Sequence, residues 1–263
     1  MRSSTKTSHS SAASSETQVS YECPICQDTE FILSKVPGTI LIGNEERQVM
    51  NEVATECECR IKKRVERLMK SSQITDSFRN MTFGSFDLEG KSPVILSMFD
   101  TVQRYAKDFA KIIELKSRQN SLCLLGQPGT GKTHLLTALS NHLISKGVAV
   151  QYFPWVEGIT DLQSDLDASN EKLAQMQKVQ LLFIDDMYKG RDKPTPWQLE
   201  KIFGVINYRY LNNLPVLISS EKTIAQMCDF DEGTGSRINE MCKEYKVTIK
   251  KDIALNYRLQ EDE

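Results

Sequence analysis

The feature that most constrains this chain is a glycine-rich run at residues 126–133, which matches the pattern G-x-x-x-x-G-K-[ST]. The run consists of Gly126, Gln127, Pro128, Gly129, Thr130, Gly131, Lys132 and Thr133. An apolar segment typical of a strand precedes it at residues 122–125, and a helical pattern follows at residues 133–145. Glycines here allow backbone N–H groups to curve around a phosphate without a Cβ in the way. The run in this context predicts a nucleotide site and disfavours a chance glycine-rich turn.

Two side chains at the end of the run have expected roles in binding ATP. Lys132 would neutralise oxygens of the β- and γ-phosphates, and the hydroxyl of Thr133 would ligate Mg²⁺. ATP and Mg²⁺ are therefore the expected cofactors of this part of the chain.

A second motif is an apolar segment at residues 181–184 that ends in the acids Asp185 and Asp186. In P-loop enzymes an Asp at the end of such a strand holds Mg²⁺, which is the role expected of Asp185. The neighbouring acid can orient or deprotonate the attacking water, so Asp186 is the catalytic candidate. Asp186 is one methylene shorter than the Glu usual at this place, and the alternative is that one of the two acids only caps the next turn.

A third apolar segment, residues 215–218, ends in Ser219, Ser220 and Glu221. Ser220 and Glu221 are candidates for a polar residue that senses the γ-phosphate from the neighbouring strand. The alternative is that Ser219 or Ser220 caps the following helix, since capping uses the same residue types. The sequence leaves both interpretations open.

From residue 93 onward the chain alternates helical and strand patterns, which predicts an α/β fold with a parallel sheet covered on both faces. The expected helices are residues 94–116, 133–145, 159–176 and 197–210, and the expected strands are 122–125, 148–153, 179–184 and 216–219. Two short helices and a terminal hairpin are expected to follow.

Aromatic residues at positions 152, 153 and 155 either stack on nucleic-acid bases, if they are exposed, or belong to the core.

Four cysteines near the N-terminus form a metal-binding pattern: Cys23 and Cys26 are two residues apart, and Cys57 and Cys59 have one residue between them. Four thiolates suffice for a tetrahedral structural Zn²⁺ site. A module of about 50 residues has too small a core to fold well alone, so a bound metal makes physical sense. The alternative is four free buried thiols. A redox role is disfavoured because no strand–CxxC–helix context is present.

Between and after these cysteines we expect two short strands, residues 31–33 and 39–42, joined by a turn at Pro37-Gly38. A helix expected at residues 59–70 carries basic side chains on one face. These side chains are candidates to contact DNA phosphates or an acidic protein surface; the alternative is that they are simply solvated. The expected organisation is a disordered tail at 1–20, a zinc-binding partner-recognition module at 21–72, a linker at 73–94 and an ATPase domain at 95–263.

Charge and composition exclude several classes of protein. The chain has 33 Lys and Arg against 35 Asp and Glu, a net charge of −2, and no stretch of the roughly 18 apolar residues that a membrane helix needs. The start of the chain lacks the apolar core of a secretory signal, so we expect a cytoplasmic protein with reduced cysteines and no membrane partner. Near-zero net charge argues against a surface coated in basic residues but allows one local patch for nucleic acid.

Taken together, the motifs resemble those of the DnaC/DnaI-type replicative helicase loaders, which are AAA+ ATPases related to phage-borne loaders and to IstB-type transposition helper ATPases. The resemblance covers about residues 21–258 and is carried by residues 126–135, 184–186, 207–210, 215–221 and 235–238, and by the cysteine segments 21–29 and 57–60. The matching run places His134 beside the P-loop as a further nucleotide-binding residue.

The resemblance implies an AAA+ parallel-sheet core without a helical lid, preceded by a small zinc-binding module. It also implies ATP hydrolysis, binding to a replicative DNA helicase and to single-stranded DNA, and self-association through the ATP site. Arg237 matches the family's arginine finger, which completes the site of a neighbouring subunit; its alternative is an ion pair with Glu240. Two other functions stay open: an IstB-like transposition helper that binds duplex DNA and a transposase, and an ATP-switched adaptor with little hydrolysis.

Overall fold

The computed structural model describes residues 21–43, 45–164, 166–190 and 192–259, with only the backbone given for residues 166–168. The tail predicted at residues 1–20 lies outside the described residues. The chain divides into two compact units, Met1–Lys62 and Lys63–Glu263, and the division falls inside helix α1 (Glu58–Ser71). Each unit is described below by itself.

The first unit contains an antiparallel pair of long strands, β1 (Phe31–Ile42) and β2 (Glu45–Glu56). The prediction of two short strands with a turn at Pro37-Gly38 is wrong, because Pro37 lies inside β1 opposite Met50. Both strands of a two-stranded sheet are edge strands, which is where sheets accept proline. The chain instead reverses directly after Ile42, where Gly43 has a positive φ of 66° that suits a tight hairpin connection.

The second unit is built on a five-stranded parallel sheet with the order β4-β5-β6-β3-β7, which confirms the predicted α/β class. The strands are β3 (Leu122–Gly126), β4 (Val150–Pro154), β5 (Leu181–Asp185), β6 (Val216–Ser220) and β7 (Tyr245–Ile249). The predicted terminal hairpin is wrong, because β7 pairs in parallel with β3. Two helices, α8 (Ile224–Phe230) and α9 (Glu232–Met241), lie between β6 and β7, and this crossover connection returns the chain in the parallel direction.

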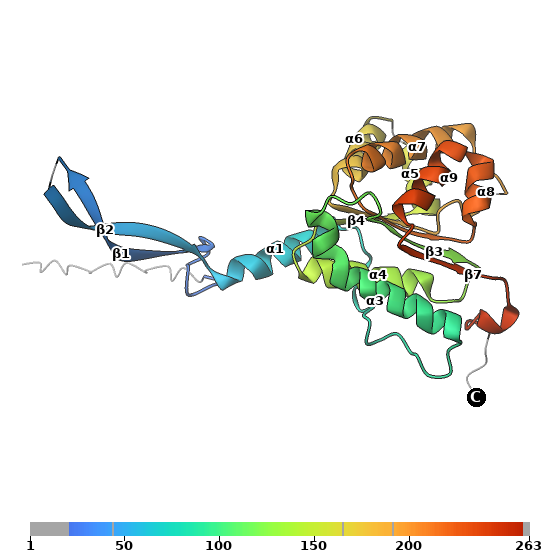
Figure 1. Cartoon of the computed structure of the whole chain (residues 1–263), viewed down its shortest axis with the longest axis horizontal. Coiled ribbons are helices and arrows are strands. Elements are labelled where there is room, and N and C mark those ends of the chain that lie inside the picture. The colour runs from blue at the N-terminus through green and yellow to red at the C-terminus, as the bar shows by residue number, and fades with distance from the viewer. Residues whose placement is uncertain (1–20, 44, 165, 191, 260–263) are drawn as a thin grey trace, which may run out of the picture. The chain divides into compact units, whose positions relative to one another are not determined.

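Two hydrophobic cores lie on opposite faces of this sheet, as the alternation of side chains along a strand requires. In β3, Leu122 and Leu124 belong to one core, whereas Cys123 and Leu125 belong to the other. Helices α3 (Pro93–Glu114) and α4 (Lys132–Ser145) cover the first face. The second face is covered by α5 (Trp155–Ser164), α6 (Leu166–Lys178), α7 (Pro196–Leu211), α8 (Ile224–Phe230) and α9 (Glu232–Met241) (Figure 1).

The helix expected at residues 159–176 is two helices, α5 and α6, and the first begins earlier, at Trp155. Trp155 is 3% exposed and packs edge-on against Tyr188, with ring centroids 5.0 Å apart. Tyr152 and Phe153 are also buried. These aromatics therefore belong to the core, and the interpretation that they are exposed for base stacking is wrong.

The segment expected to be a linker, residues 73–94, packs on the second unit. It contains the short helix α2 (Asp76–Arg79), and the amide of Asn141 on α4 donates to the carbonyls of Phe78 and Met81 at 3.0 and 2.9 Å.

After β7, the described chain contains only a 3-10 helix, η1 (Ile253–Leu255), so no helical lid covers the sheet in these residues. None of the described helices is both long and apolar enough to span a membrane.

Candidate functional site

The glycine-rich loop joins the end of β3 to the first turn of α4, as the sequence predicts. Gly126, Gly129 and Gly131 have φ angles of 120°, 79° and 85°, a region that residues with a Cβ rarely adopt. A Cβ at Gly126 would also collide with the carbonyl oxygen of Ile249 on β7. These glycines are needed for the backbone of the loop to curve and to approach its neighbours.

A cavity of about 860 Å³ opens beside this loop, a volume typical of a small-molecule site. Residues 128–134 form one wall of it. The ends of β4 and β5 contribute Tyr152, Asp185 and Asp186, and the segments before α3 and after β7 contribute Phe86, Lys91, Tyr257 and Arg258. The cavity therefore lies at the carboxyl ends of the parallel strands, where α/β sheets bind ligands.

Lys132 lies almost fully buried in this cavity, with 5% of its surface exposed. Its Nζ donates to the carbonyl oxygen of Gln127 at 2.6 Å. Burial lowers the pKa of Lys132 to about 8, although the negative charges of Asp186 and Glu221 oppose the shift. A phosphate bound in the loop would supply an opposite charge at short range and raise that pKa.

Thr133 and Asp185, the two residues expected to hold Mg²⁺, contact each other across the start of α4 and the end of β5. The hydroxyl of Thr133 donates to Asp185 Oδ1 at 2.9 Å. The same carboxylate accepts from Ser219 at 2.5 Å and from the hydroxyl of Tyr152 at 3.2 Å. Burial raises the pKa of Asp185, and these hydrogen bonds partly offset the shift. A hydroxyl and a carboxylate brought together in this way are the hard oxygen donors that Mg²⁺ prefers.

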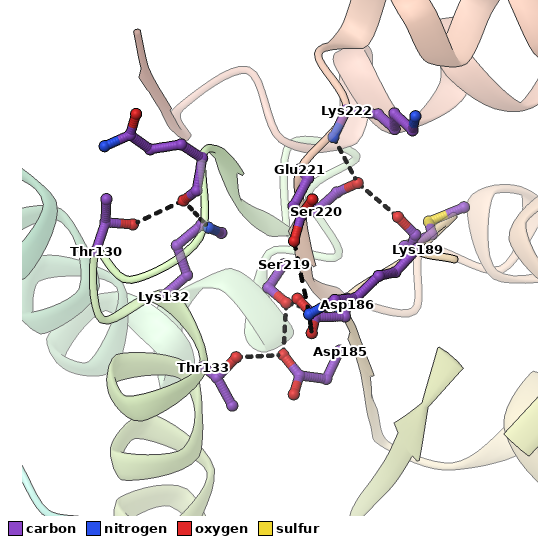
Figure 2. Close-up of polar contacts among 12 residues, drawn as sticks. Thr130, Lys132, Thr133, Asp185, Asp186, Lys189, Ser219, Ser220, Glu221 and Lys222 are labelled. Carbon is purple, nitrogen blue, oxygen red and sulfur yellow. Dashed lines mark hydrogen bonds and ion pairs between the residues drawn. The ribbon is translucent and has the colours of Figure 1, made fainter. Parts of the chain in front are cut away.

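Asp186 follows in a tight turn with φ of 54°, and its backbone N–H donates to Ser219 Oγ at 2.7 Å. Its carboxylate pairs with Lys189 Nζ at 2.6 Å, and Lys189 also pairs with Glu221 at 3.5 Å (Figure 2). Ser219 and Lys189 are site residues that the sequence analysis missed. The sequence indicates Ser219 only as a candidate helix cap, and the three-residue spacing of Asp186 and Lys189 is the one local signal for that pair.

Ser220, proposed from sequence as a nucleotide contact, is buried and directs its hydroxyl into the protein. Its Oγ donates to the carbonyl of Met187 at 2.6 Å and accepts the N–H of Lys222 at 3.1 Å. The alternative that Ser219 or Ser220 caps the next helix is wrong, because Thr223 caps α8 and forms a capping box with Gln226.

Arg237 lies within α9, and residues 232–235 just before it are already helical. Asp231 caps this helix by accepting the N–H of Thr234 at 2.8 Å, which explains why the helix begins so early. The guanidinium donates to the carbonyl of Gly233 at 2.7 Å and lies 5.3 Å from the ring centroid of Phe203. Arg237 is not one of the described residues that line the nucleotide cavity.

Glu240 and His134 are the two remaining residues that the sequence indicates. Glu240, the alternative partner of Arg237, accepts instead from the hydroxyl of Tyr210 at 2.9 Å. His134 lines the cavity, and its Nε2 lies 3.2 Å from Ser85 Oγ. The ring of Phe86 packs edge-on against that of His134, with centroids 5.3 Å apart. His134 therefore anchors the segment before α3 to the nucleotide loop.

The four N-terminal cysteines form a separate cluster in the first unit. Their sulfur atoms all lie within 4.8 Å of one another, with Cys23 and Cys57 3.8 Å apart and Cys26 and Cys59 3.3 Å apart. Zn–S bonds of about 2.3 Å place the sulfurs of a tetrahedral site about 3.8 Å apart. The four side chains therefore fit a structural Zn²⁺ ion in number, chemistry and spacing.

The pKa values of the clustered thiols are shifted in opposite directions, lowered for Cys23 and raised for Cys57 and Cys59. Hydrogen bonds from the backbone of Cys26 and Ile25 lower the pKa of Cys23 to about 7. The pKa of Cys59 is raised, first by its hydrogen bond with Cys26 and then by burial. The thiol of Cys23 is thus more readily ionised than that of Cys59. A bound divalent cation would favour the thiolate form of all four cysteines.

Comparisons with known proteins agree with this geometry. The model of the family described as IstB-like ATP binding protein matches residues 45–231. The chain is 44% identical to the phage-like element PBSX protein XkdC of Bacillus subtilis, covering 91% of this chain and 87% of that protein. It is 27% identical to the replicative helicase loader DnaI of the same organism, covering 76% of this chain and 64% of DnaI.

Solved structures show the same fold. A crystal structure of DnaI matches 68% of this chain and 94% of its own, with a TM-score of 0.54 and 22% identity. The DnaC helicase loader matches 67% of this chain and 100% of its own, with a TM-score of 0.54 and 21% identity. The parallel sheet that carries the nucleotide loop and the acidic strand end thus has a fold shared with DnaI and DnaC. The chain belongs to the IstB-like ATP-binding protein family, is similar in sequence to the helicase loader DnaI, and shares its fold with DnaI and DnaC.

Proposed function

We propose that this protein is an ATP-dependent helicase loader that binds a replicative DNA helicase and delivers it to single-stranded DNA. The observation that carries the proposal is the combination, in one chain similar to DnaI, of a nucleotide site with a separate four-cysteine unit. A loader needs a nucleotide-controlled part and a part that recognises its cargo. The two units of this chain provide candidates for each.

In this proposal the residues of the nucleotide site have distinct tasks. The backbone of the loop and Lys132 bind the phosphates, and Thr133 and Asp185 hold Mg²⁺, which offsets phosphate charge when bound. Asp186 orients the attacking water from the turn after β5. Arg237, which lies outside the lining of its own cavity, acts on the nucleotide of a neighbouring subunit. ATP hydrolysis would then depend on contact between subunits.

The four cysteines in turn hold a Zn²⁺ ion that stabilises the partner-recognition unit. A two-stranded hairpin such as β1–β2 is only marginally stable alone, because it buries little apolar surface. Leu33 and Leu41 of β1 are each 71% exposed, so the hairpin contributes little core. A metal bound at the base of the hairpin would supply the missing stability. The exposed apolar side chains would then be available to the helicase.

A two-stage assay tests this function. The full-length tagged protein is first used with ATP to capture partners from host extract, and the Cys26→Ser variant is the control. We expect the wild type to recover a replicative helicase and the variant to recover much less. Purified helicase is then offered a circular single strand with an annealed oligonucleotide, and displacement of the oligonucleotide reports loading. We expect displacement only when the loader and ATP are both present.

Specific results would refute the proposal. Recovery of a transposase in place of a helicase would favour the transposition helper, a second candidate that the family match itself supports. ATP-dependent capture without measurable hydrolysis under loading conditions would favour an ATP-switched adaptor. Helicase loading that is unaffected by omission of ATP would refute the nucleotide-dependent mechanism.

A further inference from the structure

Lys189 lies between the ends of two neighbouring strands and pairs with an acid from each. Its Nζ is 2.6 Å from Asp186 Oδ2, after β5, and 3.5 Å from Glu221 Oε1, after β6. Figure 2 shows these three side chains together beside Ser219, at the end of the sheet that carries Asp185. Lys189 also lines the nucleotide cavity, together with Lys132 and Asp186. This cation is therefore placed at the strand ends, where the terminal phosphate of a nucleotide would be recognised.

The other polar groups at the end of β6 are unsuited to contact a phosphate. The hydroxyl of Ser220 is fully buried and already bonded to the carbonyl of Met187 and the N–H of Lys222. Glu221 is an acid, and a carboxylate beside a phosphate is repelled by it. Neither side chain can act as an attractive sensor of the γ-phosphate in this arrangement.

The surrounding charges keep Lys189 cationic and hold it in place. Burial lowers the pKa of Lys189, but its hydrogen bond with Asp186 and the charges of Asp186 and Glu221 outweigh burial and raise it overall. An ammonium group has three donors, so it can keep one acid as a partner while it donates to a phosphate oxygen. Its side chain is 38% exposed, which leaves it free to turn toward a ligand in the cavity.

We propose that Lys189 distinguishes ATP from ADP by donating to the γ-phosphate from within the same subunit. Asp186 and Glu221 hold the ammonium ready, and the γ-phosphate takes the place of Asp186 as its partner. The carboxylate of Asp186 is then released to orient the attacking water. The inference rests on the ATP-binding part of the proposed function and is independent of helicase loading.

Equilibrium binding without turnover tests this role directly. Isothermal titration calorimetry with Mg²⁺ compares a non-hydrolysable ATP analogue with ADP for the wild type and for Lys189→Met. We expect the variant to bind the ATP analogue about tenfold more weakly, which corresponds to about 1.4 kcal/mol. The affinity for ADP should change by less than about twofold, since ADP lacks the recognised group. Lys189→Arg, which keeps the positive charge, should restore most of the discrimination.

Two further variants control this comparison. Lys193→Met removes an exposed lysine from the same loop and should bind both nucleotides as the wild type does. Glu221→Gln removes the charge of the acid that still holds the ammonium once the γ-phosphate has displaced Asp186, and should bind the ATP analogue more weakly, with ADP unchanged. Glu221→Gln also tests the proposal if Lys189→Met fails to fold, which a thermal melt would reveal.

The role is overturned if Lys189→Met binds the ATP analogue as tightly as the wild type, or weakens ATP and ADP binding equally. An unchanged ratio of the two affinities in Glu221→Gln would overturn it as well. None of these measurements involves a helicase. A failed loading assay would therefore refute the proposed function while leaving this result in place.

Discussion

Replacing Ser219 by Ala removes one buried hydroxyl that joins the two acids of the nucleotide site. Its Oγ donates to Asp185 Oδ1 at 2.5 Å and accepts the N–H of Asp186 at 2.7 Å, and the residue has 0% exposure. A hydrogen bond to a charged group contributes about 1.5–3 kcal/mol, and a buried donor left unpaired costs about 1–3 kcal/mol. Since one atom makes both bonds and the site can relax, we expect the free energy of unfolding to fall by about 3 kcal/mol.

Differential scanning calorimetry measures this loss in the second unit. In a domain of roughly 150–250 residues, each kcal/mol shifts the Tm by about 2–4 °C, so Ser219→Ala should lower it by about 6–12 °C. Ser145→Ala is the matched control, because that hydroxyl is exposed and bonds only to the carbonyl of His142 in its own helix, at 2.7 Å. Its Tm should change by less than about 2 °C.

The pH dependence provides a second check on the same prediction. The pKa of Asp185 is raised by burial, and the bond from Ser219 opposes that shift, so its removal should raise the pKa further. A carboxyl with a raised pKa in the folded state favours folding when protonated, and this advantage is lost as the pH rises through that pKa. The deficit of Ser219→Ala relative to wild type should therefore be larger at neutral pH than in acid. A Tm within 2 °C of wild type at neutral pH, or a deficit that is larger in acid, would refute the reasoning.

Three further predictions concern nucleotide, metal and subunit contacts. Because burial lowers the pKa of Lys132 to about 8, nucleotide affinity should fall about tenfold between pH 7 and pH 9 as the ammonium deprotonates; a flat profile in titration calorimetry would contradict this. Purified protein should contain about one Zn²⁺ by metal analysis, and Cys26→Ser should lose it and unfold the first unit while the ATPase unit still melts cooperatively; a folded, zinc-free first unit in the wild type would argue against the ligand set. Arg237→Ala and Lys132→Ala should each be nearly inactive as ATPases. When the two variants are mixed with each other, in the presence of helicase and single-stranded DNA, they should regain partial turnover. Wild-type turnover by Arg237→Ala alone would exclude a role in trans.

Short-range spacing along the chain was sufficient to predict the local motifs and the general fold class. The strand–loop–helix at residues 122–145, the acidic end of β5 and the clustering of four cysteines all depend on short-range spacing, and the structure contains each of them. Alternating helix and strand patterns were sufficient to predict a parallel sheet, because the two kinds of element have different apolar periods.

Which side chains meet between strands was decided only by the tertiary structure. Ser219 reaches Asp185 because β6 lies beside β5, with Ile184 opposite Ile218, and strand order is not encoded in any local period. The long hairpin, the parallel pairing of β7 and the helical setting of Arg237 likewise depend on contacts distant in sequence. Lys189 joins acids from two strands for the same reason. Spacing along a chain identifies chemical groups, whereas packing of the whole domain selects which of them become neighbours.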